Sequence, residues 1–243
     1  MSVYQYDGSL EGFYCAVFRA VRQKETPEAI EAFGARQMRL FPPVEIKTVP
    51  EQAARVRGGI QNKISPEALE LTETVFCSCL EEKELHLLRF LLRGFRGGVD
   101  LRQGFSDPEL ARLLSAKRHL LNEAHLLKGF VRFADYDGHL AAVITPKNFL
   151  LPFIARHFCV RYRNEDFMIF DQTHHVAFLY EQRQPRMVAA DRIDFPDYSA
   201  DEQAFRALWK QFYRTVAIEG RENPRCRMTH MPKRYWANMT EME

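Results

Sequence analysis

The fold of this chain is decided by residues 116–180, which read AKRHLLNEAHLLKGFVRFADYDGHLAAVITPKNFLLPFIARHFCVRYRNEDFMIFDQTHHVAFLY. A helical pattern ends near Lys128, and a strand-like alternation follows at 130–133. The pair Asp137-Gly138 then lies between two apolar runs and predicts a tight hairpin, because both turn positions need a positive φ. A second helical pattern begins after Pro146.

Two further strand-like runs lie at 167–170 and 175–180, on either side of the polar turn 171–174. They predict a second hairpin. The fold class is therefore α+β: mostly helical, with a small antiparallel sheet made by two hairpins around residues 129–180 and with helices packed on one face.

Helix-start signals divide the remainder of the chain. Near the N-terminus, Ser9 is a candidate N-cap before one helical pattern, and Pro50 lies in the first turn of another. Further along, Ser199-Ala200-Asp201-Glu202 has the spacing of a capping box. The helix that follows carries an apolar stripe of Phe205, Leu208, Trp209, Phe212, Tyr213 and Val216.

The length of 243 residues suits one compact domain, 1–243. A sub-division near 97–103 is the alternative, because glycines there give a stop signal. It would separate a helical part, 1–97, from an α+β part, 104–243.

Composition indicates a cytoplasmic protein. No stretch approaches the roughly 20 apolar residues that a membrane span needs, and the first residues lack the basic and apolar regions of a signal peptide. The five cysteines form no CxxC pair, which favours reduced thiols over disulfides. We therefore expect no metal site and no cofactor held by this chain.

The net charge of +2 does not by itself demand nucleic acid, but its distribution is uneven. The segment from Phe205 to Trp236 holds an excess of six positive charges: Arg206, Lys210, Arg214, Arg221, Arg225, Arg227, Lys233 and Arg234 against Glu219 and Glu222. Such cations neutralise phosphates, and Tyr235 or Trp236 could stack on an unpaired base. A solvated basic tail whose Tyr-Trp pair fills a gap in the core is the alternative.

Four residues are candidates for acid, base or ligand chemistry. Glu123 and His125 lie two apart on a helix, so they do not face each other. His157 lies on an apolar stripe, where histidines are usually hydrogen-bonded core residues. Asp171 begins the turn that also holds two histidines, but turn chemistry explains it well, and a metal there needs a third ligand from elsewhere.

Common signatures of catalysis and phosphate binding are absent from the sequence. It contains no GxxxxGK[ST], no GxGxxG, no GxSxG elbow and no HxE…CxxC pattern.

Three blocks carry a resemblance to a known family: YQYDGSLEGF at 4–13, EAHLLKGFVRF at 123–133 and MPKRYW at 231–236. In this order they resemble a bacterial family of DNA metabolism or DNA repair proteins, built on a domain of unknown function. The resemblance spans nearly the whole chain.

The resemblance implies a context rather than a reaction. Members of that family are typically encoded beside a radical S-adenosylmethionine protein for DNA modification or repair. A similar domain is sometimes fused to a uracil-DNA-glycosylase-like domain, for which we expect no room here because the sequence ends seven residues after Trp236. No catalytic residue carries over from the family.

The leading hypothesis is an accessory protein that binds DNA, single- or double-stranded, and works with the radical S-adenosylmethionine partner. Its expected nucleic-acid contacts are Arg118, Lys128, Arg132, Arg214, Arg221, Arg225, Arg227, Lys233, Arg234, Tyr235 and Trp236. One alternative is a nuclease or base-processing enzyme that uses Glu123, His125, His157 or Asp171. The other is a protein–protein adaptor anchored by Tyr235 and Trp236. Whether the chain is an enzyme stays open.

Overall fold

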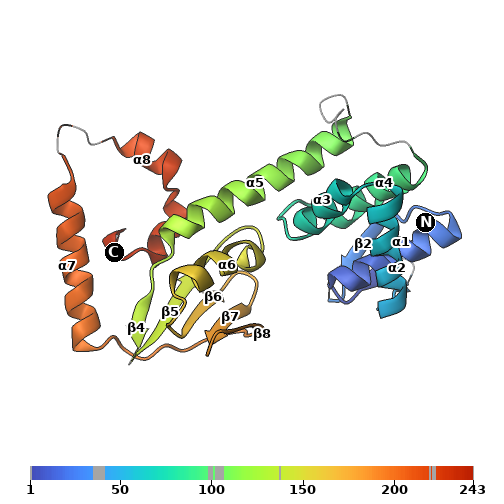
Figure 1. The fold of residues 1–243 in the computed structure, drawn as a ribbon. Helices are drawn as coiled ribbons and strands as arrows, with labels where there is room; N and C mark the ends of the chain where they lie inside the picture. Colours follow the sequence, from blue (N-terminus) through green and yellow to red (C-terminus); the bar gives the residue numbers. More distant parts are fainter. Residues whose placement is uncertain are drawn as a thin grey trace. The chain divides into compact units, whose positions relative to one another are not determined.

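The structure is a computed structural model, and it describes residues 2–34, 42–97, 101, 107–136, 138–218, 220 and 223–242. The chain forms two compact units, Met1–Leu120 and Leu121–Glu243. The division falls inside helix α5 (Pro108–Phe130), so this helix contributes to both units (Figure 1). Most of the segment 97–103 lies outside the described residues.

Unit 1 combines helices with a three-stranded parallel sheet in the order β2-β1-β3. Its elements are β1 (Val3–Tyr6), α1 (Leu10–Gln23), β2 (Ala29–Ala32), β3 (Val44–Glu45), α2 (Pro50–Lys63), α3 (Pro66–Phe76), α4 (Lys83–Phe95) and the first part of α5. Helix α1 begins where the sequence predicts, because Ser9 Oγ accepts a hydrogen bond from Gly12 N at 2.9 Å. The core includes Tyr4, Phe13 and Leu91, all fully buried.

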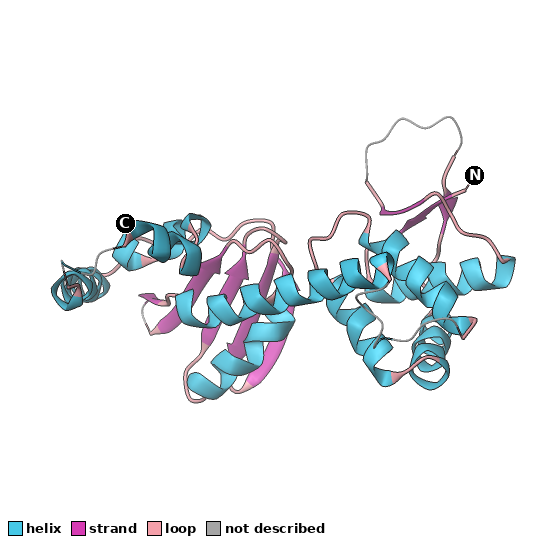
Figure 2. Cartoon of the chain, turned by 90° about the horizontal axis from the view of Figure 1, so that it is seen from above, coloured by secondary structure: helices cyan, strands magenta, loops and turns pink. Residues whose placement is uncertain are grey.

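Unit 2 is built on a five-stranded sheet in the order β4-β5-β6-β7-β8. Its elements are the end of α5, β4 (Ala134–Tyr136), β5 (His139–Ile144), α6 (Leu151–Arg161), β6 (Phe167–Asp171), β7 (Val176–Glu181), β8 (Gln184–Ala189), α7 (Ala200–Val216), α8 (Pro224–His230) and two short 3-10 helices, η3 (Lys233–Asn238) and η4 (Thr240–Met242). Figure 2 shows α6 and the end of α5 lying over one face of this sheet.

The α+β class is confirmed, and so are both hairpins, since β4 pairs antiparallel with β5 and β6 with β7. The expectation of an antiparallel sheet is corrected in one respect. Strands β5 and β6 run parallel, with Ile144 opposite Asp171, so the sheet is mixed. The reason is that α6 carries the chain back along the sheet before β6 begins, as parallel pairing requires.

The strand expected at 130–133 is displaced. Helix α5 continues to Phe130, with a further helical bond from Val131 N to Leu127 O at 3.0 Å, and β4 starts at Ala134. Phe133 instead packs edge-on against three rings, those of Phe158, Tyr162 and Phe167, at centroid distances of 4.9 to 5.6 Å. Its side chain therefore belongs to the core between α6 and the sheet.

The first hairpin turns at Gly138, whose φ of 87° requires glycine. Asp137, the other predicted turn residue, lies outside the described residues. All five cysteines are free. Within the described part of the chain, no helix has the length and apolar character that crossing a membrane demands.

Candidate nucleic-acid interface

Glu123 is the centre of a buried polar network in unit 2. The residue is 2% exposed, and its two carboxylate oxygens accept hydrogen bonds from Lys147 N (3.1 Å), Asn148 N (2.9 Å) and Asn148 Nδ2 (2.5 Å). Arg234 Nη2 (2.9 Å) and Tyr235 Oη (2.8 Å) also donate to it. The carboxylate thus joins α5, the loop after β5 and η3.

The electrostatics of this network keep Glu123 ionised. Burial raises the pKa of this carboxyl, but the hydrogen bonds from Lys147 N, Asn148 and Tyr235 outweigh burial, and the net pKa lies below its ordinary value. Burial and the Glu123 hydrogen bond also raise the pKa of Tyr235, which stays a neutral donor. A carboxylate with this many donors is occupied within the chain, so it positions other residues.

Three residues expected to contact nucleic acid are engaged within the chain. Tyr235 is 2% exposed and cannot stack on a base. Arg234 pairs with Glu123, and its guanidinium Cζ lies 4.6 Å from the Tyr235 ring centroid. Arg132 forms a bidentate pair with Glu241, with Nη2–Oε1 at 2.5 Å and Nε–Oε2 at 3.1 Å. These side chains hold the C-terminal segment in place.

The exposed cations of the expected set lie on the C-terminal elements of unit 2. They are Arg214 on α7, Arg225 and Arg227 on α8, and Lys233 and Arg234 on η3, of which Arg234 is held by its ion pair with Glu123. Lys128 is half-buried, Arg118 is exposed but belongs to unit 1, and Arg221 lies outside the described residues.

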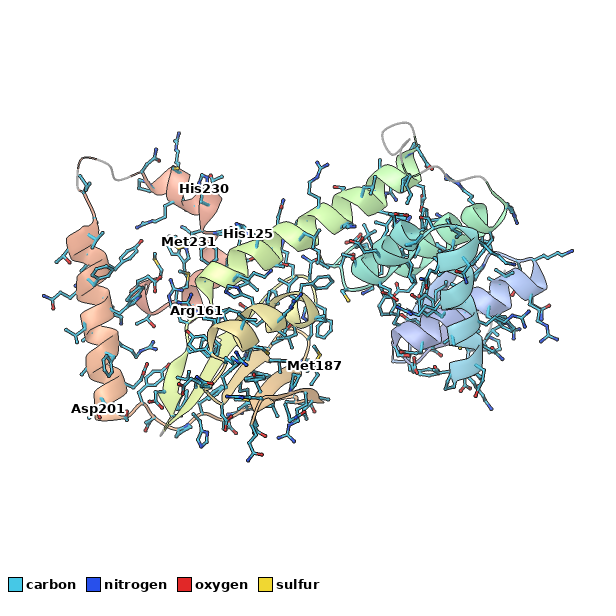
Figure 3. All side chains as sticks on the ribbon, viewed as in Figure 1. His125, Arg161, Met187, Asp201, His230 and Met231 are labelled. Atoms are coloured by element: carbon cyan, nitrogen blue, oxygen red, sulfur yellow. The ribbon has the colours of Figure 1, made fainter. Side chains whose placement is uncertain are left out.

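Two of these cations face one indole. Arg227 Cζ lies 5.4 Å and Lys233 Nζ 5.8 Å from the ring centroid of Trp236. The half-buried Trp236 is fixed by a hydrogen bond from its Nε1 to Met231 O at 3.0 Å. We call Arg227, Lys233 and Trp236 the Trp236 cluster; it combines positive charge with an anchored aromatic ring. Figure 3 labels Met231 and His230, which mark the end of α8 beside it.

The turn between β6 and β7 holds an aspartate–histidine pair. Asp171 is fully buried and accepts from Thr173 N (3.1 Å), His174 N (3.2 Å) and His174 Nδ1 (2.7 Å). The His174 side chain is 27% exposed, and its ring meets that of Phe149 edge-on at 5.5 Å. The hydrogen bonds from Thr173 N and His174 N show that Asp171 stabilises the turn. Its bond to His174 Nδ1 also orients that imidazole.

The remaining catalytic candidates lie apart from these groups. His125, labelled in Figure 3, is exposed on α5. His157 is exposed on α6 rather than buried in the core. The pKa of its imidazole lies below the ordinary value, first because the ring loses part of its hydration and second because Lys128 and Arg161 place positive charges nearby. Within the described ranges, no hydrogen bond, ion pair or ring contact joins any two of Glu123, His125, His157 and Asp171. Nor do the described residues contain a group of three or more His, Cys, Asp or Glu side chains placed to hold a metal ion.

Comparison with protein families assigns most of this structure to one domain. The model of a domain of unknown function, DUF4130, matches residues 81–241. The chain belongs to this family. The DUF4130 region runs from α4 to η4, so it includes the Glu123 network and the Trp236 cluster and leaves α1 to α3 outside. Among curated proteins and among solved structures, none matches this chain.

Proposed function

We propose that this protein binds nucleic acid as an accessory factor in DNA metabolism or repair, through the exposed C-terminal surface of unit 2. The observation that carries the proposal is the Trp236 cluster, in which an anchored indole lies beneath two cations. Arg214 on α7 and Arg225 on α8 add exposed positive charge within the same unit.

The chemistry of this surface suits a single strand. Lysine and arginine side chains release condensed counterions when they neutralise backbone phosphates. An aromatic face accepts any base without reading its hydrogen-bonding edge, and each stacked base contributes about 1–3 kcal/mol. The Glu123 network holds this surface in place, because Glu123 binds Arg234 and Tyr235 of η3, the segment that also carries Lys233 and Trp236.

The resemblance to DNA metabolism and repair proteins supplies the partner in this proposal. The bound DNA would be presented to a radical S-adenosylmethionine protein, which would bring the iron–sulfur cluster and the chemistry. In the proposed division of labour, this chain contributes binding and orientation.

Replacing Trp236 by leucine tests the proposal. Loss of one stacked base should weaken binding of a single-stranded oligonucleotide about tenfold, and binding of a duplex much less, because paired bases do not offer their faces. Fluorescence anisotropy measures both. Phe205→Leu, which alters an aromatic side chain 69% exposed outside the cluster, is the matched control. Equal losses in both variants would refute a role for Trp236 as the stacking residue.

A second candidate function, that of a protein-binding adaptor, is favoured by α7. This helix makes polar contacts to the rest of unit 2: Glu202 Oε2 accepts from Asp135 N at 3.1 Å, and Trp209 Nε1 donates to Glu241 at 3.0 Å. Its apolar stripe is open to solvent, with Phe205 at 69%, Leu208 at 61%, Phe212 at 56% and Val216 at 60% exposure. Contiguous exposed apolar residues of this kind mark interaction surfaces.

If α7 docks the radical S-adenosylmethionine protein, Leu208→Ser combined with Phe212→Ser should abolish their co-elution in size-exclusion chromatography. Both side chains are exposed, so the fold should be unchanged by circular dichroism. Leu121→Ser combined with Val160→Ser removes two other exposed apolar side chains of unit 2 and should leave co-elution intact. Co-elution that survives the α7 substitutions would exclude this helix as the docking surface.

A further inference from the structure

Unit 1 contains a hollow lined by arginines that the proposed interface does not use. Its volume is about 270 Å³, and its lining residues are Thr26, Arg89, Leu92, Arg93, Arg96 and Glu109. The three arginines come from α4 at positions i, i+4 and i+7, which places them on one face of that helix. We call this hollow the α4 arginine pocket.

Arg93 is held in a fixed position at the pocket. Its guanidinium forms a bidentate pair with Asp107, in which Nη1 donates to Oδ1 at 3.2 Å and Nη2 donates to Oδ2. Asp107 also accepts from Glu109 N and Leu110 N at the start of α5. The Arg93 hydrogen bonds lower the pKa of Asp107, so this anchor stays charged.

Glu109 is engaged on the same side. His86 Nδ1 lies 2.6 Å from Glu109 Oε1, and His86 Nε2 lies 3.1 Å from Arg112 Nη1. Because arginine has only donors, Nε2 must accept, and the ring proton on Nδ1 is donated to Glu109. The pocket and its supports therefore contain four guanidiniums and two carboxylates, an excess of two positive charges.

The two excess positive charges lie on Arg89 and Arg96. Both are exposed, and neither has an ion-pair partner among the described residues. They flank the fixed Arg93 along one helix face. Guanidiniums converging on one hollow repel each other until an anion lies between them, and their planar donor forks match the oxygens of a phosphate.

We propose that the α4 arginine pocket binds a phosphate monoester. The Thr26 hydroxyl adds a neutral donor, and the volume is below the roughly 300–1,000 Å³ of pockets for drug-sized ligands, which suits a phosphate with little more than its sugar. Two sources offer this group: the 5′ end of a nucleic acid and a free nucleotide. The first source rests on the proposed function and extends it, because it would give the protein a preference for strand ends.

The experiment compares single-stranded oligothymidylates, labelled at the 3′ end, that carry either a 5′-phosphate or a 5′-hydroxyl. Anisotropy titrations should show the wild-type protein binding the phosphorylated strand about tenfold tighter, since hydrogen bonds to charged groups are each worth that much or more. Arg89→Gln combined with Arg96→Gln should remove the difference and leave binding of the hydroxyl strand unchanged. Arg93 is left in place because it anchors the start of α5.

The matched control is Arg55→Gln combined with Lys63→Gln, which removes two exposed cations of α2 outside the pocket and should keep the tenfold preference. Competition by thymidine 5′-monophosphate distinguishes the sources. If it displaces the phosphorylated strand at equal concentration, the pocket recognises free nucleotides; if it fails at large excess, the pocket needs a strand end.

If the wild type binds both strands equally, the α4 arginine pocket does not recognise the 5′-phosphate, and the proposed function is unaffected. A preference that persists in the Arg89/Arg96 variant would lead to the same conclusion. The reverse result is also distinguishable. If no oligonucleotide binds, but thymidine 5′-monophosphate raises the melting temperature of the wild type and not of the Arg89/Arg96 variant, the pocket stands and the proposed function fails.

Discussion

Replacing Glu123 by glutamine is expected to destabilise unit 2 by about 1–3 kcal/mol, the cost of leaving a buried hydrogen-bond donor without an acceptor. Glutamine has the same size, but it offers one acceptor oxygen to five donors and places its own amide against them. Arg234 would lose its partner and Tyr235 its acceptor. The segment that carries the Trp236 cluster should therefore loosen first.

Urea unfolding followed by tryptophan fluorescence measures this effect in unit 2 alone, because both tryptophans, Trp209 and Trp236, lie in that unit. His125→Ala is the control: it alters an exposed side chain two residues away on the same helix, and should change stability by less than about 0.5 kcal/mol. If Glu123→Gln unfolds at the same urea midpoint as His125→Ala, the Glu123 network does not stabilise unit 2.

The same carboxylate gives a pH dependence whose sign follows from its lowered pKa. Above the ordinary value of 4.5 the group is ionised in both states, and its contribution to stability is complete. Below that value the unfolded chain takes up the proton first, so this contribution is lost as the pH falls through the folded-state pKa. Glu123→Gln should lose less stability than the wild type over that window.

Substituting Arg227 and Lys233 together by glutamine should weaken binding of a single strand at least tenfold at low salt. The plot of log K against log salt should flatten by about 1.4, because each lost phosphate contact on a single strand removes about 0.7. Both side chains are exposed, so the fold should be preserved. Fluorescence anisotropy over a salt series measures affinity and slope together.

Arg156→Gln combined with Arg163→Gln controls for net charge, because both arginines are exposed in unit 2 and lie outside the Trp236 cluster. An equal flattening in this control would show that the cluster is not the contact site. Charge reversal at Arg234, which the basic run MPKRYW would suggest, cannot test binding cleanly. It would also break the pair with Glu123 and so change stability.

The sequence predicted elements whose signals are local. Ser9 caps α1 and Pro50 opens α2 as their spacing indicates, and the Gly138 turn produces the first hairpin. It did not predict the parallel pairing of β5 with β6, nor β2 and its pairing with β1, because partners distant in the chain decide such pairings. Strand β1 lies at the centre of its sheet, between β2 and β3, and both of these partners come later in the chain.

Partners distant in the chain also decide which single residues of the site are buried and which stay exposed. The run 231–236 carried two interpretations, a binding surface or a plug for the core, and each holds for part of it. Tyr235 is buried against Glu123, while Trp236 and Lys233 stay accessible. Glu123 lies 112 positions before Tyr235, so nothing in the run itself could separate the two. Likewise, the spacing of the α7 stripe indicated an apolar face but not that it would remain open to solvent.

The most direct test of the account is the affinity of the wild-type protein for a labelled single strand over a salt series. With the exposed Arg214, Arg225, Arg227 and Lys233 as the four phosphate contacts, we expect micromolar or tighter binding at low salt and a slope of log K against log salt of about −3. Absence of binding at low salt, or binding that does not change with salt, would contradict the account.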